Sequence, residues 1–179
     1  MEMEGQQSIG ASRNEVWRAL NDLDVLRDCI PGCTELVSES ENNLKARITL
    51  KIGSIKVNFS SNILLSEIDQ PNGYVLSGKG EGGAAGFAEA KVRIRLNEEG
   101  ESTLLHYTGQ VEIGGKIAQL GSRLIDATSR KYITRFFEDF VAVVEPEAAA
   151  RLQSDRQIGW FSRLIAAIKS FFGMGQKKQ

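Results

Sequence analysis

The sequence predicts an α+β domain in which a curved, seven-stranded antiparallel sheet wraps around a long C-terminal helix, followed by an amphipathic tail helix. Three observations support this prediction. Apolar and polar residues alternate with a period of two through most of residues 44–113, as in strands with one solvated face. From Ile117 to Val144 the apolar period becomes helical, and a second helical pattern follows Pro146. With 179 residues, the chain has room for one core.

The N-terminal region is expected to contain one strand and two short helices. Residues 1–10 form the strand. Ser12 and, three residues later, Glu15 form a capping box, which marks the start of a helix. A second short helix is expected from Leu23 to Cys29, and it ends at the Ile30-Pro31-Gly32 segment because proline and glycine interrupt helices.

Six further strands complete the predicted sheet. Gly53, Pro71-Asn72-Gly73 and Asn97–Glu101 are turn signals that separate them. Each strand has one polar face, as expected of an antiparallel sheet that is solvated on one side. The strands are expected over residues 34–39, 44–52, 55–65, 74–79, 88–96 and 105–113.

The long helix is expected to present one apolar row to the sheet. Gly114-Gly115 ends the last strand, and every fourth residue after it continues the row: Leu120, Leu124, Thr128, Tyr132, Phe136 and Phe140. A sheet with one apolar face and a helix with one apolar stripe bury both by packing together. The sequence therefore predicts a strongly curved sheet around this helix.

The charge of the chain is divided into two blocks. Residues 1–150 carry 16 basic and 22 acidic side chains, whereas residues 151–179 carry six basic and one acidic. An acidic body argues against nucleic acid as a partner, because phosphate binding needs a basic face. The basic tail suggests an anionic surface instead.

The tail is interpreted as a membrane-associating helix. We expect a domain over 1–145, a linker over 146–157 and the tail over 158–179. On a helical wheel the large apolar residues form one arc, and the charges opposite are all basic, which is typical of a helix in a membrane interface. Docking on a protein partner and packing on its own domain are the alternatives. The residues assigned to membrane binding are Trp160, Phe161, Leu164, Ile165, Ile168, Lys169, Phe171, Phe172, Lys177 and Lys178.

The glycine-rich stretch 78–86 contains a GxGxxG pattern but does not indicate a nucleotide site. Such a site needs a helix N-terminus after the glycines, and a strand pattern follows instead. One interpretation is that small residues leave a cavity under the long helix or let a flat ligand approach the backbone. The other is a flexible hairpin with sharply bent strands.

No catalytic or metal-binding constellation is evident. Cys29 and Cys33 are the only cysteines and His106 the only histidine, so a structural zinc site lacks ligands and the cysteines are interpreted as structural thiols. His106 falls on a polar strand face. The N-terminus lacks a secretory profile and no apolar stretch reaches the ~18–20 residues that span a bilayer, so we expect a cytoplasmic protein.

Residues 1–145 resemble the START-like helix-grip superfamily of pollen allergens, polyketide cyclases and lipid carriers. Three details resemble the family of the carbon monoxide dehydrogenase G subunit in particular. They are Ile30-Pro31-Gly32-Cys33, the glycine-rich stretch 78–86, and the segment 114–121 (GGKIAQLG) together with Phe136-Phe137. The basic amphipathic tail is similar to the C-terminal anchor of that family.

This resemblance implies a non-catalytic accessory protein with a defined set of partners. Such proteins attach a molybdenum hydroxylase, such as carbon monoxide dehydrogenase, to the inner face of the cytoplasmic membrane. They are thought to hold a hydrophobic molecule, a quinone, so that electrons reach the respiratory chain. No other cofactor is implied. The alternatives are a START-like enzyme of the cyclase or hydrolase type and a general lipid carrier, because fold alone does not decide function.

The ligand is expected between the inner face of the sheet and the long helix, with small residues at the mouth of the pocket. The residues predicted to contact it are Val57, Phe59, Gly83, Ala84, Gly86, Phe87, Tyr107, Leu120, Leu124 and Thr128.

Overall fold

The computed structural model describes residues 1–145. The predicted linker and tail, residues 146–179, lie outside the described residues, so the domain boundary at 145 stays a prediction. The helical elements are α1 (Arg13–Leu20), α2 (Leu23–Cys29), the short 3-10 turns η1 (Gly83–Ala85) and η2 (Lys116–Leu120), and α3 (Ser122–Val144). The strands are β1 (Glu2–Ile9), β2 (Cys33–Ser40), β3 (Asn43–Ile52), β4 (Ile55–Asp69), β5 (Gly73–Glu81), β6 (Phe87–Glu99) and β7 (Ser102–Gly114).

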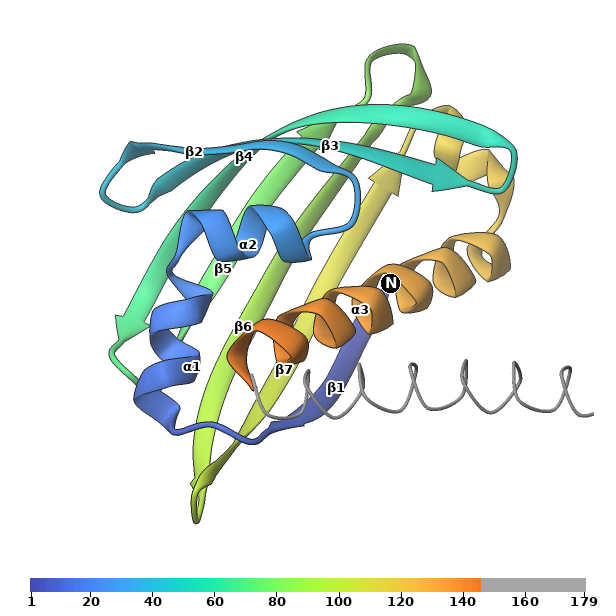
Figure 1. Ribbon diagram of the computed structural model, residues 1–179. Coiled ribbons are helices and arrows are strands. Elements are labelled where there is room, and N and C mark those ends of the chain that lie inside the picture. The colour runs from blue at the N-terminus through green and yellow to red at the C-terminus, as the bar shows by residue number, and fades with distance from the viewer. Residues whose placement is uncertain (146–179) are drawn as a thin grey trace, which may run out of the picture.

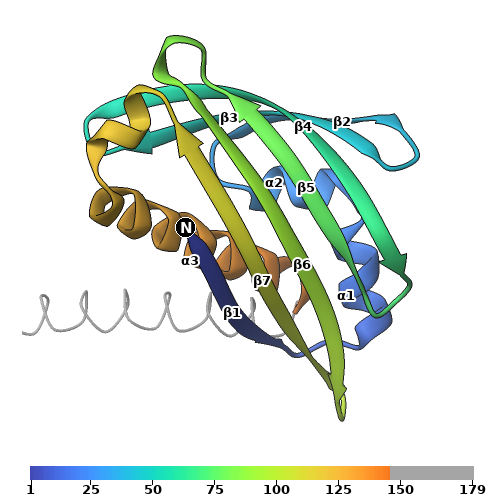
Figure 2. The ribbon, with the colours of Figure 1, turned by 180° about the vertical axis from the view of Figure 1, so that it is seen from behind.

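The seven strands form one antiparallel sheet in the order β1-β7-β6-β5-β4-β3-β2. The sheet curves around α3, and α1 and α2 lie on the same concave side (Figure 1). The convex side carries no helix in the described part of the chain (Figure 2). The predicted α+β class, a curved seven-stranded antiparallel sheet around a long C-terminal helix, is confirmed.

The two short helices begin and end where the sequence indicates. The Ser12 backbone amide donates a hydrogen bond to the Glu15 carboxylate over 2.9 Å, and the Glu15 amide donates to the Ser12 hydroxyl, so the capping box is formed. Asp22 caps α2 by accepting from the amides of Asp24 and Val25. Local hydrogen bonds therefore fix the path of the chain from β1 to β2.

The long helix begins later than predicted. Residues 116–120 form the 3-10 turn η2, and α3 starts at Ser122. Gly121 has a φ of +89°, a left-handed conformation that interrupts the α-helical backbone. The predicted apolar row is also wrong at its start, because Leu124 is 37% exposed and Ile125 takes the inward position.

Two apolar clusters hold the helix to the sheet. The larger one surrounds Phe140, which is fully buried, and includes residues of α1, β1, β6 and β7. Within it the rings of Trp17 and Tyr74 meet edge to face, with centroids 5.7 Å apart. The smaller cluster contains Ile52, Phe59 and Ile117, at the other end of α3. The C-terminal half of α3 is thus packed more extensively than its first turns.

Thr103 is a buried polar residue that ties the sheet to the start of α1. Its side chain is fully buried, and its hydroxyl donates a hydrogen bond of 2.8 Å to the Ala11 carbonyl. The Ala11 carbonyl lies between β1 and α1, so the bond fixes the turn that connects them. A buried acceptor that loses its donor is costly because water cannot replace it.

We expect Thr103→Val to lower the free energy of unfolding by about 1–3 kcal/mol, because the isosteric side chain leaves the Ala11 carbonyl without its donor. Urea denaturation followed by circular dichroism measures the change. Thr108→Val is the control, since Thr108 lies on the same strand but is exposed. Equal stability of the two variants would contradict a structural role for the buried hydrogen bond.

Candidate ligand-binding cavity

A cavity of about 480 Å³ lies between the concave face of the sheet and α3. Its volume falls within the ~300–1,000 Å³ of typical small-molecule sites. Residues of α3 line it at successive helical turns: Ile125, Thr128, Ser129, Tyr132, Ile133, Phe136 and Phe137. The α2–β2 connection adds Ile30 and Pro31. Among the described residues that line it, none carries a charge, so the cavity suits an uncharged, largely apolar molecule.

Small side chains occupy part of the concave face, among larger residues that line the cavity. Tyr74 and Leu76 line the cavity, so strand alternation places Gly78 and Gly80 on the same face of β5. Gly78 pairs with Ala90 and with the larger Ile63, and Gly80 pairs with Ser61 and Ala88. The small side chains among these residues leave room between the sheet and α3.

Gly80 in β5 and Gly82, just after it, also accommodate the ring of Phe59. A Cβ atom on Gly80 would lie 3.3 Å from the Phe59 ring, and one on Gly82 would lie 3.2 Å from it. Side chains at these positions would therefore displace the ring. Phe59 lies across this part of the sheet and forms one wall of the cavity.

Hydroxyl groups are the polar features of the lining. The Tyr132 hydroxyl accepts a hydrogen bond of 2.9 Å from the Lys51 amide and so joins α3 to β3. The Thr128 hydroxyl donates to the Leu124 carbonyl. Within residues 1–145, the hydroxyls of Tyr107 and Ser129 make no hydrogen bond. Burial raises the pKa of Tyr74 to about 12, so its ring is neutral.

Three of the ten residues predicted to contact a ligand line this cavity: Phe59, Tyr107 and Thr128. Val57 is buried in the smaller cluster, Leu120 packs against that cluster, and Leu124 is exposed on the first turn of α3. None of these three lines the cavity. Val57, on β4, is packed within the smaller cluster, and Leu120 and Leu124 are displaced because the chain reaches α3 through the η2 turn rather than by a continuous helix. Ligand contact at any of the ten stays a prediction.

The other four predicted residues, Gly83, Ala84, Gly86 and Phe87, lie at the β5–β6 connection and do not line the cavity. Gly86 has a φ of +118°, which suits glycine, and Phe87 lies under the Lys79 ammonium, 5.2 Å from its ring centre. In one interpretation the stretch 78–86 leaves a cavity, but the predicted contact residues do not include Gly78 and Gly80. Their period-two spacing from Tyr74 and Leu76 is the signal that identifies them as inward-facing.

The remaining candidate motifs form no reactive centre in the described part of the chain. Burial raises the pKa of Cys29 to about 11 and also raises the pKa of Cys33, so both thiols are protonated at neutral pH. Neither is in a disulfide. His106 pairs with Arg95 across the strands. Within residues 1–145, no cluster of side chains is arranged to hold a metal ion, and the helices are too short or too polar to span a bilayer.

Comparison with solved structures shows which known proteins this domain is similar to. A conserved protein from Geobacillus kaustophilus is 32% identical, with a TM-score of 0.76 over 80% of this chain and 95% of that chain. Zhui aromatase/cyclase from Streptomyces sp. R1128 is 13% identical, with a TM-score of 0.63 over 83% and 95% of the two chains. A START superfamily protein from Mycobacterium smegmatis is 12% identical, with a TM-score of 0.63 over 81% and 97%. No curated protein matches the chain.

The last two likenesses show the fold alone and confirm the START-like helix-grip architecture. The family model of the carbon monoxide dehydrogenase G subunit (CoxG) matches residues 5–145, almost all of the domain that encloses the cavity. Because this match spans more than half of the chain, the chain belongs to the family of the carbon monoxide dehydrogenase G subunit (CoxG).

Proposed function

We propose that this protein is a non-catalytic accessory protein of a molybdenum hydroxylase of the carbon monoxide dehydrogenase type. It holds a hydrophobic molecule, a quinone, in the cavity and attaches the enzyme to the inner face of the cytoplasmic membrane. Electrons then pass from the enzyme to the respiratory chain through the bound quinone. The observation that carries the proposal is the uncharged, largely apolar cavity in a member of this family.

The cavity lining suits the chemistry of a quinone. A quinone is a flat apolar ring with two carbonyl acceptors and an isoprenoid chain. The rings of Tyr107 and Phe137 stack with centroids 5.6 Å apart and present flat apolar surface. Tyr107 and Ser129 have hydroxyl protons to donate, and Tyr132 keeps its own proton because it accepts from Lys51. Three residues with a hydroxyl proton to donate thus line an otherwise apolar cavity.

The alternatives are a START-like enzyme of the cyclase or hydrolase type and a general lipid carrier. In the described residues, the cavity lining contains no carboxylate, imidazole or thiol, the groups that usually perform acid–base or nucleophilic chemistry. The lining therefore favours carriage over catalysis. The hydroxyl donors favour a ligand with carbonyl groups over a hydrocarbon.

Membrane attachment is assigned to residues 158–172, where the apolar and basic residues segregate in the sequence. This leaves the acidic surface of the domain for the hydroxylase. Solubility of the domain is an equally simple role for that acidic charge, so recruitment depends on the family membership for its support.

Filling the cavity is expected to weaken quinone binding. Ala88 lines the cavity on β6, and Ala88→Phe adds a ring where the structure has space, so the protein stays folded. Quenching of intrinsic fluorescence by a short-chain ubiquinone or menaquinone should then need at least about tenfold more ligand, ~1.4 kcal/mol. Ala127→Phe, on the exposed side of α3, is the control. Unchanged binding in Ala88→Phe would place the ligand elsewhere.

Removing hydroxyl donors is expected to affect quinones selectively. The double variant Tyr107→Phe, Ser129→Ala should weaken binding of a short-chain quinone by ~1–3 kcal/mol, the sum of two neutral hydrogen bonds. Competition with squalene, an isoprenoid without carbonyl groups, should be unaffected. Equal losses for both ligands would indicate a lipid carrier that does not recognise a quinone head group.

Deleting residues 151–179 is expected to separate enzyme binding from membrane attachment. The full chain should sediment with vesicles that contain phosphatidylglycerol and retain the hydroxylase on membranes. The shortened protein should co-purify with the hydroxylase but leave both in the soluble fraction. Replacing Lys169, Lys177 and Lys178 with alanine should weaken sedimentation mainly at low salt, because salt screens this attraction. A hydroxylase that stays on membranes without this protein would exclude recruitment.

A further inference from the structure

One end of the domain is more basic than the acidic body around it. There the β3–β4 hairpin, η2 and the start of α3 meet (Figure 1). We call this surface the end patch, defined by Lys51, Ile55, Lys56, Lys116, Arg123 and Leu124. We propose that the end patch docks on an anionic lipid surface and holds one end of the cavity against the bilayer. This inference rests on the proposed membrane role, and it adds a second contact besides the tail.

Direct contacts join the three segments of the end patch. The Lys51 amide donates to the Tyr132 hydroxyl of α3. A Cβ atom on Gly53, at the hairpin turn, would lie 3.3 Å from the Leu124 side chain. Ile52 and Ile117 share the smaller apolar cluster beneath. Side chains distant in sequence are therefore held together on one surface.

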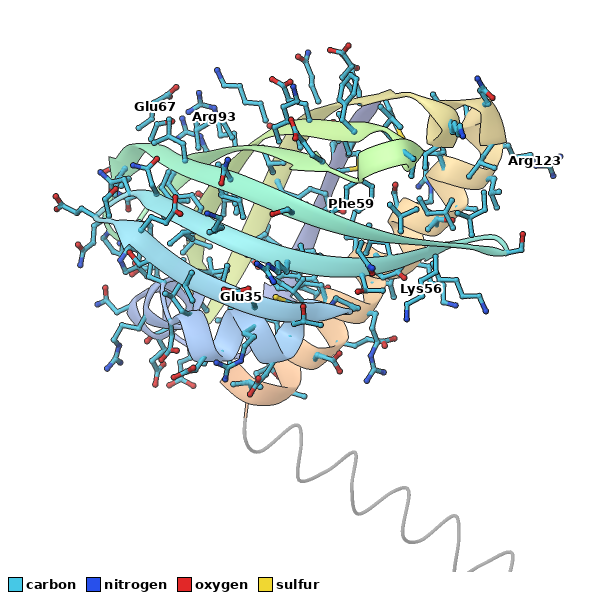
Figure 3. All side chains as sticks on the ribbon, turned by 90° about the horizontal axis from the view of Figure 1, so that it is seen from above. Glu35, Lys56, Phe59, Glu67, Arg93 and Arg123 are labelled. Carbon is cyan, nitrogen blue, oxygen red and sulfur yellow. The ribbon has the colours of Figure 1, made fainter. Side chains whose placement is uncertain are left out.

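The positive charge of the end patch is not neutralised within the described residues. Lys51, Lys56, Lys116 and Arg123 are exposed, and no ion pair involves any of them within residues 1–145. The segments that carry them, 51–56 and 116–125, contain no acidic residue. Lys56 and Arg123 extend into solvent from the same end of the molecule (Figure 3). Four cations in this arrangement attract an anionic surface.

The acidic residues of β6 and β7 are separated from the β3–β4 hairpin by the intervening strand β5. Glu89 alternates along β6 with Ala88 and Ala90, which face inward, so Glu89 is on the convex side of the sheet. Glu112 pairs with it on β7 and lies on that side too. Lys51 and Lys56 face the convex side by the same alternation, so the intervening strand β5, and not the face of the sheet, separates these carboxylates from the end patch.

Two large apolar side chains of the end patch are exposed. Ile55 is 39% exposed at the start of β4, and Leu124 is 37% exposed on the first turn of α3. Exposed aliphatic side chains surrounded by lysine and arginine are typical of surfaces that insert shallowly into a bilayer, where the chains are buried and the cations meet lipid headgroups. An acidic protein would use the charge but leave Ile55 and Leu124 without a role.

The end patch covers one end of the cavity. Ile52, Ile117 and Ile125 line the cavity and belong to the same hairpin, turn and helix as the patch residues. A bilayer on this surface would lie next to that end. A hydrophobic ligand could then move between lipid and cavity with little exposure to water, which avoids the cost of hydrating its apolar surface.

A polarity-sensitive fluorophore at the hairpin tip tests the proposal in the full chain. Ser54→Cys accepts the label in a Cys33→Ser background, where buried Cys29 does not react. Its emission should shift to the blue with vesicles of phosphatidylcholine and phosphatidylglycerol, but not with phosphatidylcholine alone. The same label at Glu99→Cys, on the β6–β7 hairpin, should not respond. An equal shift at both positions, or an equal response to soluble polyglutamate, would overturn the proposal.

Charge reversal identifies the residues responsible. Lys56→Glu with Arg123→Glu should raise the lipid concentration needed for the Ser54 shift by at least about tenfold. Lys91→Glu with Arg95→Glu, an identical charge change on the convex face, should leave it unchanged, and equal effects of the two double variants would contradict the proposal. Sedimentation distinguishes this proposal from attachment by the tail. If the full chain sediments but Ser54 stays in water, the end patch is wrong and tail attachment stands. If the full chain does not sediment, the proposed attachment fails as well.

Discussion

The packing of α3 into the concave face of the sheet is the constraint on which the rest of this structure depends. The extent of this packing differs between the two ends of α3. Near its C-terminal end, Phe140 is fully buried among residues of α1, β1, β6 and β7, and the Glu145 carboxylate accepts a hydrogen bond from the Gly10 amide. Burying a phenylalanine side chain contributes ~1.5–3 kcal/mol, so this end is anchored. Towards its N-terminus, the helix lies beside the cavity and the smaller cluster instead.

In the cavity, the protein thus lacks the stabilising free energy that close packing of apolar side chains would contribute. Gly78, Gly80, Ala88 and Ala90 fill little volume, and replacing them with larger residues would bring the sheet into contact with α3. Close packing is the rule in protein interiors, and departures from it tend to mark functional sites. The hydrogen bond between Lys51 and Tyr132 spans the gap between β3 and α3, so the helix is held at a distance that keeps the space open.

The charged side chains are also distributed unevenly between the two ends of α3. The domain is acidic overall, yet the segments at the N-terminal end of α3 and the β3–β4 hairpin carry cations without ion-pair partners in the described residues. Long-range attraction to an anionic surface would therefore orient the domain, and local contacts of Ile55 and Leu124 would hold it. An accessory protein that exchanges a hydrophobic molecule with a membrane needs such an orientation.

The sequence by itself determined the strands, the capped short helices and the helix-grip arrangement, because alternation, the Ser12–Glu15 capping box and the apolar run to Val144 are local patterns. Strand alternation also contained the signal that Gly78 and Gly80 face inward, although the predicted contact residues did not include them. Tertiary structure alone decided that Gly121 ends a 3-10 turn and starts α3 late, which exposes Leu124 and turns Ile125 inward. It also decided which residues line the cavity and that Lys56 and Arg123, far apart in sequence, share a surface. Such pairings depend on how distant segments pack, and no local period records them.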